Sequence, residues 1–96
     1  MGREAEGSGI TPEVLARLNR AVFRAVANAR HDADMTHQDL ADVLGLTRNQ
    51  VVNMERGRRA IKASELILIG KAVGVAPDEL LRRAILFKDP RRMKRG

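Results

Sequence analysis

A break of only three residues, Gly45-Leu46-Thr47, separates two segments with the apolar spacing of helices, and it constrains the fold more than any other sequence feature. Thr36 caps the first segment, which Gly45 ends because glycine tolerates a left-handed backbone conformation. Thr47 then caps the second segment, residues 48–55. The inward positions are Leu40, Ala41, Leu44, Leu46, Val51 and Met54. Because so short a turn forces a large angle between helices, we expect two short helices crossing closely at Ala41.

A long helix is predicted before this corner. Thr11, Pro12 and Glu13 have the residue types of a helix start, with an N-cap, a proline in the first turn and an acid near the positive end of the dipole. The helix is expected to span about 19 residues and to end near Arg30. Its apolar residues recur at spacings of three and four and predict one buried stripe, formed by Leu15, Leu18, Val22, Val26 and Ala29.

Two further helices are predicted after the corner. A strongly apolar helix starts near Ser64 and stops at Gly74, and another opens at Pro77 and runs to about Phe87. We interpret the lone glycines as helix stops. No segment has the alternation of a strand.

The fold class predicted from these segments is all-α: a compact five-helix domain with an extended first helix, over residues 11–87. Residues 1–10 are expected to form a disordered arm, because they are polar and glycine-rich, and residues 88–96 a basic tail. With 96 residues there is one domain at most, and with two Phe, no Tyr and no Trp the core must be aliphatic.

Positive charge is concentrated in two zones. Residues 82–96 carry seven Arg or Lys against one Asp, so they account for the formal net charge of +6, and the first 81 residues balance. Within those 81, residues 47–62 hold five basic side chains against Glu55. Such zones indicate a polyanionic partner, with simple solubility as the alternative explanation.

Several classes of function are disfavoured. The chain has no Cys, which excludes disulfides and thiolate metal sites. We expect no enzyme activity, because no nucleophile–base pair, carboxylate dyad or phosphate-binding glycine loop is present. We also expect no cofactor and no metal site, since His31 and His37 fall on different elements. No apolar run can span a bilayer or serve as a signal peptide, so we expect a cytoplasmic, nucleoid-associated protein.

The outward face of the helix at residues 48–55 carries side chains that can recognise bases. Arg pairs with guanine and Asn or Gln with adenine through two hydrogen bonds, and a recognition helix presents its first residues to the major groove. The candidates for base contact are Arg48, Asn49, Gln50 and Asn53. The alternative is a merely solvated helix face.

Residues 35–81 closely resemble the Cro/phage-repressor type of helix-turn-helix, also called the Xre family, whose fold is lambda-repressor-like. The resemblance rests on Leu44-Gly45-Leu46-Thr47, on Glu55-Arg56-Gly57-Arg58 and on Ala72-Val73-Gly74-Val75 followed by Asp78-Glu79-Leu80-Leu81. It implies a sequence-specific regulator of transcription that binds double-stranded DNA, in most cases as a repressor and as a homodimer on a palindromic operator.

The resemblance also implies roles for individual residues. Arg48, Asn49 and Asn53 would contact bases, and Gln50 a base or a phosphate. The family often has Gln where this sequence has His37, so a phosphate contact there is an expectation set against plain exposure. Further phosphate contacts are expected from Arg58, Arg59 and Lys62. Arg30 is expected to form a structural ion pair with Glu55.

Two departures from the family pattern suggest association with a protein. Val43 and Leu68 stand where the family commonly has polar residues, and the fifth helix carries more apolar residues than one face needs. We expect a homodimer interface formed by Leu81, Ile85, Leu86 and Phe87, with core packing against the first helix as the rival explanation. The alternative function is an antitoxin or interaction module of the same fold that acts through a partner protein.

Overall fold

The computed structural model describes residues 11–86, and within that range it contains five α-helices and no strand. They are α2 (Pro12–Asp32), α3 (His37–Leu44), α4 (Arg48–Glu55), α5 (Ala63–Val73) and α6 (Pro77–Leu86). The predicted all-α five-helix fold is confirmed. The expected arm, Phe87 and the basic tail lie outside the described residues.

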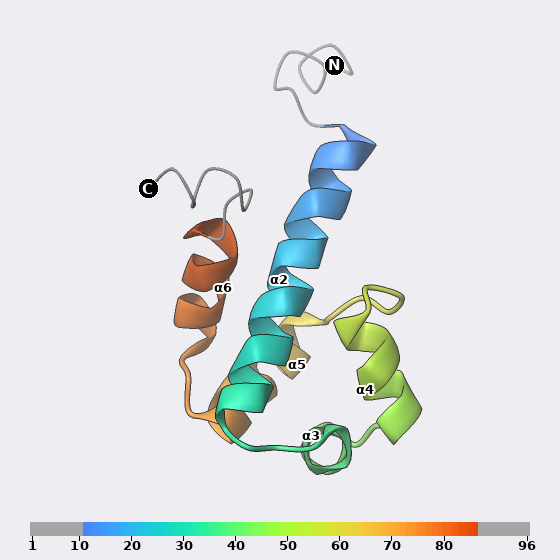
Figure 1. Cartoon of the computed structure of the whole chain (residues 1–96), viewed down its shortest axis with the longest axis vertical. Helices are drawn as coiled ribbons and strands as arrows, with labels where there is room; N and C mark the ends of the chain where they lie inside the picture. The colour runs from blue at the N-terminus through green and yellow to red at the C-terminus, as the bar shows by residue number, and fades with distance from the viewer. Residues whose placement is uncertain (1–10, 87–96) are drawn as a thin grey trace.

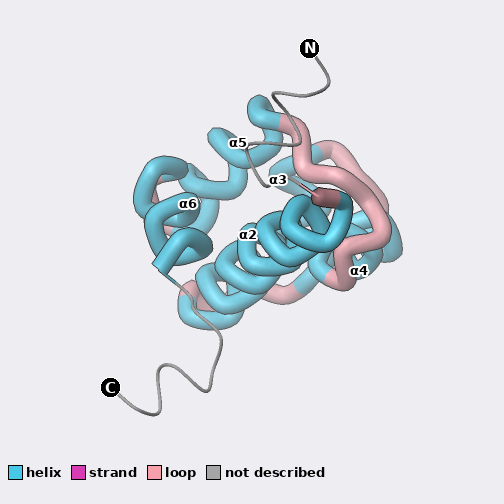
Figure 2. The backbone as a smooth tube through the Cα atoms, turned by 90° about the horizontal axis from the view of Figure 1, so that it is seen from above, coloured by secondary structure: helices cyan, strands magenta, loops and turns pink. Residues whose placement is uncertain are grey.

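The long helix α2 is the axis of the molecule (Figure 1). Seen along it, α6 lies on one side, and α3 and α4 lie on the other (Figure 2). The Thr11 hydroxyl accepts the backbone N–H of Val14 and so caps the helix start, as predicted. The helix ends at Asp32, two residues beyond the expected end. Asp34 then takes a left-handed backbone conformation with φ of 57°, which turns the chain toward α3.

Both helices of the predicted corner begin with a reciprocal cap. Thr36 accepts the N–H of Asp39 at 3.0 Å while Asp39 accepts the N–H of Thr36 at 2.9 Å. Thr47 and Gln50 exchange the corresponding bonds at the start of α4. Gly45, with φ of 70°, ends α3 as predicted. These local bonds fix the two helix starts independently of tertiary packing.

The core lies where α2, α3, α4, α5 and α6 converge. Ala41 is fully buried, which lets α3 and α4 approach closely, and the predicted inward residues Leu44 and Leu46 pack against the core. The buried cluster consists of Val26, Ala29, Leu40, Ala41, Val51, Met54, Ile69 and Leu80. At about 25 cal/mol per Å² of apolar surface, burial of these side chains is the main stabilising contribution.

The buried stripe predicted along α2 is wrong in its first half. Leu15 is 51% exposed and Leu18 is 52% exposed, whereas Phe23, outside the predicted stripe, is buried. The reason is the length of α2: its first turns project beyond the other described helices, and α6 runs beside its middle part (Figure 1). Helical spacing predicts which residues share a face but not how far a neighbour covers that face.

The interpretation of every glycine as a helix stop is also wrong. Gly70 lies inside α5 and is buried. A Cβ there would lie 2.6 Å from the Val75 carbonyl oxygen and 3.0 Å from Pro77 Cδ. Gly70 therefore permits a tight approach between α5 and the start of α6 rather than ending a helix. Among the described residues, no helix has the length and apolar character needed to cross a membrane.

Candidate nucleic-acid interface

The helix α4 presents one buried and one open face. Val51 and Met54 are fully buried and anchor it to the core. Arg48 and Asn49 are exposed in its first turn, and Asn53 is half-buried one turn further along. The turn before it is short and hydrogen-bonded, with the N–H of Leu46 donating to the Ala41 carbonyl at 3.0 Å. The opening turn of α4 thus stands on a rigid support with its polar side chains in solvent.

Gln50 is exposed but already has a structural contact. Its Oε1 accepts the backbone N–H of Thr47 at 2.9 Å, which is half of the reciprocal cap of α4. Its amide NH₂ group remains available as a donor. Gln50 can therefore offer a base or a phosphate two N–H donors while it holds the helix start.

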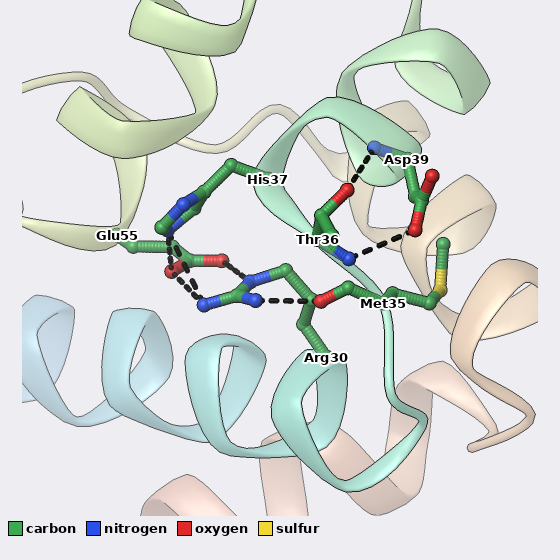
Figure 3. A network of polar contacts seen from close by, with 6 residues as sticks. All are labelled: Arg30, Met35, Thr36, His37, Asp39 and Glu55. Carbon is green, nitrogen blue, oxygen red and sulfur yellow. Dashed lines mark hydrogen bonds and ion pairs between the residues drawn. The ribbon is translucent and has the colours of Figure 1, made fainter.

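Arg30, Glu55 and His37 form a network that joins α2, α4 and α3 (Figure 3). Arg30 Nε donates to Glu55 Oε2 at 2.7 Å and Arg30 Nη2 donates to Glu55 Oε1 at 3.1 Å, so the guanidinium binds the carboxylate through two bonds. Arg30 Nη1 also donates to the Met35 carbonyl at 2.7 Å. The exposed fraction is 12% for the Arg30 side chain and 8% for that of Glu55. The network therefore fixes the end of α4 to α2 and to the start of α3.

The structure places the His37 ring against this ion pair. His37 Nε2 lies 3.2 Å from Glu55 Oε1 and 3.2 Å from Arg30 Nη2. The tautomer decides whether that nitrogen donates to the carboxylate or accepts from the guanidinium. Only Nδ1 is left for a phosphate. This contact was not predicted from the sequence, although His37 at the first position of α3 faces the element that carries Glu55.

The structure thus brings Arg30, Glu55 and His37 together at the base of α4 and leaves Arg48 and Asn49 at its open end. A sequence model described as helix-turn-helix, of the Cro/C1 type, matches residues 26–80, which is more than half of the chain. The chain belongs to the helix-turn-helix family. The resemblance inferred from the sequence is confirmed, and family and fold are those of DNA-binding regulators.

Solved structures agree with this assignment to the helix-turn-helix family. A structure of the clp gene regulator ClgR from Corynebacterium glutamicum is 25% identical to this chain, with a TM-score of 0.67, over 71% of this chain and 72% of that chain. A second ClgR structure from the same organism gives 25% identity and a TM-score of 0.66, over 71% of this chain and 87% of that chain. A comparison with curated proteins finds no match.

The basic residues expected to contact phosphates differ in how they are held. Arg58 and Lys62 are exposed. Arg59 instead binds Glu65 through two hydrogen bonds, of 2.8 and 3.1 Å, and Glu65 also accepts the backbone N–H of Lys62 at 3.0 Å. These bonds hold the loop at residues 56–62 against the start of α5. Glu65 is buried although it is charged, and it was not among the site residues predicted from the sequence.

The Arg59–Glu65 contact changes the acidity of both groups. The hydrogen bond from the Arg59 guanidinium, opposed by burial, holds the pKa of the Glu65 carboxyl below its ordinary value. The same hydrogen bond raises the pKa of Arg59. Glu65 is thus ionised at neutral pH and fixes Arg59 toward α5.

The apolar residues expected to form a dimer interface are exposed. The exposed fraction is 40% for Leu81, 67% for Ile85 and 58% for Leu86, whereas Phe87 lies outside the described residues. The match with the helix-turn-helix family ends at residue 80, before these positions, and begins at residue 26, after the exposed Leu15 and Leu18. The apolar surface of both helix ends is therefore an addition to the part of the chain that matches the family.

Proposed function

We propose that this protein is a sequence-specific regulator of transcription that binds double-stranded DNA and inserts α4 into the major groove. The observation that carries the proposal is the open first turn of α4, where Arg48 and Asn49 are exposed while Val51 and Met54 hold the opposite face in the core. Arg48 would pair with guanine, and Asn49 and Asn53 with adenine. Gln50 would donate its amide to a base or a phosphate.

Phosphate contacts would set the orientation on the duplex. Arg58 and Lys62 are the exposed candidates on the loop after α4, and the Nδ1 atom of His37 is a candidate at the start of α3. Arg59 is a weaker candidate than the sequence suggested, because a phosphate would have to compete with Glu65 for its guanidinium. Such contacts release counterions from the DNA. The logarithm of the binding constant should therefore fall by about 0.9 for each tenfold rise in salt concentration and each phosphate neutralised.

We further propose a homodimer on a palindromic operator, joined through Leu81, Ile85, Leu86 and Phe87. Support comes from the exposed apolar end of α6. Two copies of α4 would then enter successive major grooves about 34 Å apart. A dimer bound at such a site would block RNA polymerase, so the proposed outcome is repression of transcription. We propose that the protein acts in the cytoplasm, in association with the nucleoid.

Selection of bound duplexes from a random pool tests this proposal. The expected result is an enriched motif with two inverted half-sites whose centres lie about one helical turn apart. Selection with an Arg48→Ala variant should lose the preference at one or two positions in each half-site. A pool that shows no enrichment with the unmodified protein would contradict sequence-specific binding.

A second candidate function, an antitoxin or interaction module, has one specific observation in its favour. Val43 on α3 and Ile67 and Leu68 on α5 are 44%, 50% and 41% exposed, and α3 packs against α5. Exposed apolar side chains on two contacting helices suit a partner protein. Purification with the products of neighbouring genes tests it: a stable complex lost in Leu68→Glu would support this function.

A further inference from the structure

A groove lies beyond the C-terminal end of α4, lined by residues of α2, of the loop at residues 56–62, of α5 and of α6. Its volume is about 620 Å³. Ala16 and Asn19, from the projecting part of α2, form one wall, and Ala60 of the loop lies in the other. Arg48 is at the opposite end of α4, about 12 Å away along the helix at 1.5 Å per residue. The groove is thus separate from the proposed base-reading turn.

The floor of the groove is apolar and held in place. It is formed by Val22, Phe23, Ile61, Leu66 and Leu81. Phe23 is buried under the loop: a Cβ added at Gly57 would lie 3.1 Å from the Phe23 ring, and the left-handed Gly57, with φ of 79°, lets the loop pass directly over it. Val22, Ile61 and Leu66 remain partly exposed. The floor therefore offers fixed apolar surface to a ligand.

The rim of the groove is entirely cationic among the described residues that line it. Arg20, Arg56, Arg58 and Lys62 are exposed, and within residues 11–86 their side chains make no ion pair. No acidic side chain lines the groove. Glu55, at the end of α4, is already bound by Arg30 and His37. Glu65, which interacts electrostatically with Lys62, lies outside the lining, so the groove keeps an excess of positive charge.

We propose that this groove, which we call the 16–66 groove, binds an acidic amphipathic helix of a partner protein. Leucine-type side chains at helical spacing would cover the floor, and carboxylates flanking them would pair with the four rim cations. A DNA backbone satisfies the cations but leaves the apolar floor uncovered, so the combination favours a peptide. The groove does not include the base-reading turn of α4. Arg58 and Lys62 are also the proposed phosphate contacts, and Leu81 is part of the proposed dimer interface, so a partner helix here would compete with both.

A designed probe tests the proposal on the full chain. The probe is a fluorescein-labelled peptide of about 15 residues with Leu on one helical face and Glu on the other, compared with a Lys-for-Glu version and a scrambled version. Fluorescence anisotropy should detect binding of the acidic amphipathic peptide alone. Equal binding of the scrambled peptide would overturn the proposal, because it would mean attraction by charge without recognition of a helix face.

A matched pair of variants locates the site. Ala16→Glu places a negative charge on the groove wall, and Ala76→Glu places the same charge at an exposed alanine outside the groove. Neither substitution touches the core. We expect Ala16→Glu to weaken peptide binding about tenfold and Ala76→Glu by less than about twofold. Equal weakening by both would overturn the proposal.

Amide chemical shifts on titration decide between occupants. The acidic peptide should shift the amides of Ala16, Asn19 and Ile61. Shifts confined to Arg48 and Asn49 would overturn the proposal, because the peptide would then be acting as a DNA mimic on α4. The same Ala16 and Asn19 shifts on addition of duplex DNA would assign the groove to the DNA backbone instead, and shifts on concentrating the protein alone would assign it to a second copy.

Discussion

A single carboxylate, that of Glu55, links three helices. Its side chain is 8% exposed and contacts Arg30 of α2 and His37 of α3. An ion with so little contact with water is tolerated only where partners replace its hydration. The two bonds from Arg30 provide that replacement, and they tie the end of α4 to α2.

Removing Arg30 should therefore cost more than removing an exposed arginine. We expect Arg30→Ala to lower the free energy of unfolding by about 3 kcal/mol, because it leaves the Glu55 carboxylate with only His37 and solvent. Arg17→Ala, on the exposed face of α2, should change it by less than about 0.5 kcal/mol. Urea denaturation of both variants makes the comparison. Equal effects would show that the buried pair contributes no more than a surface charge.

Arg48 and Arg58 are both exposed, but we assign them opposite roles. Arg48→Ala should reduce discrimination between the operator and a base-substituted operator by about 1–3 kcal/mol. Arg58→Ala should weaken binding to every duplex to a similar extent and reduce the slope of affinity against salt by about one. Titrations at several salt concentrations measure both. If Arg48→Ala loses the same affinity for operator DNA and for random DNA, α4 does not read bases through that residue.

At the scale of single residues, sequence reasoning identifies chemical types better than contacts. Gln50 is a typical base-contacting residue, yet its carbonyl is bonded to Thr47, because a threonine followed three residues later by glutamine is also a helix cap. Arg59 is one of several neighbouring basic residues, yet it is the one that forms an ion pair with Glu65. Such choices depend on which side chains meet across a turn, and residue type alone does not encode that.

Among the elements, the loop at residues 56–62 depends most on a polar contact. It joins α4 to α5, and its Arg59 side chain and Lys62 backbone both bind Glu65. The loop also carries three of the four rim cations of the 16–66 groove, Arg56, Arg58 and Lys62. Glu65 thus holds the loop whose cations we assign to DNA phosphates and to a partner helix.

The contribution of Glu65 to stability should depend on pH. Its folded-state pKa is lowered, chiefly by the hydrogen bond from Arg59, so the unfolded chain holds the Glu65 proton more tightly. The stabilisation is therefore fully present above the unfolded-state pKa of about 4.3 and is lost as pH falls through the lowered folded value. We expect Glu65→Gln to lower the free energy of unfolding by about 1–2 kcal/mol near neutral pH.

The test is a series of urea denaturations from neutral to acidic pH. The deficit of Glu65→Gln should shrink as pH falls from the unfolded-state pKa of about 4.3 through the lowered folded-state pKa, because the native carboxyl then also becomes protonated. Glu79→Gln is the matched control, since Glu79 forms more exposed pairs with Arg82 and Arg83 and should have little effect at any pH. If Glu65→Gln lowers the free energy of unfolding by the same amount even in strong acid, the charge of Glu65 is not the source of the stabilisation.

Helix bounds that depend on adjacent residues can be predicted from the sequence, whereas burial that depends on distant residues cannot. The bounds of α3 and α4 match the prediction because caps and a glycine stop are local signals carried by adjacent residues. The predicted burial of Leu15 and Leu18 is wrong because cover by neighbouring helices is a tertiary property. Gly70 was misassigned for the same reason, because its role depends on the approach of Val75 and Pro77.

For the whole molecule, the fold, the open helix and the exposed apolar residues of α6 could be predicted from the sequence, and the 16–66 groove could not. Core residues and base-reading residues each recur at helical spacing within a single helix, so both can be recognised from the sequence. The 16–66 groove combines α2, a loop, α5 and α6, which lie far apart in the sequence. Such surfaces require the three-dimensional arrangement.

Association through the end of α6 should determine how the whole protein binds DNA. Ile85 is 67% exposed, so Ile85→Glu should leave the monomer folded while it places a buried charge in the proposed dimer. We expect this variant to sediment as a monomer and to lose much more affinity for an operator with two half-sites than for one half-site, because linked binding provides the excess. Ile67→Glu, on α5, is the control and should remain dimeric. A variant that stays dimeric, or equal losses on both duplexes, would move the interface away from α6, with the exposed leucines of α2 as the next surface to substitute.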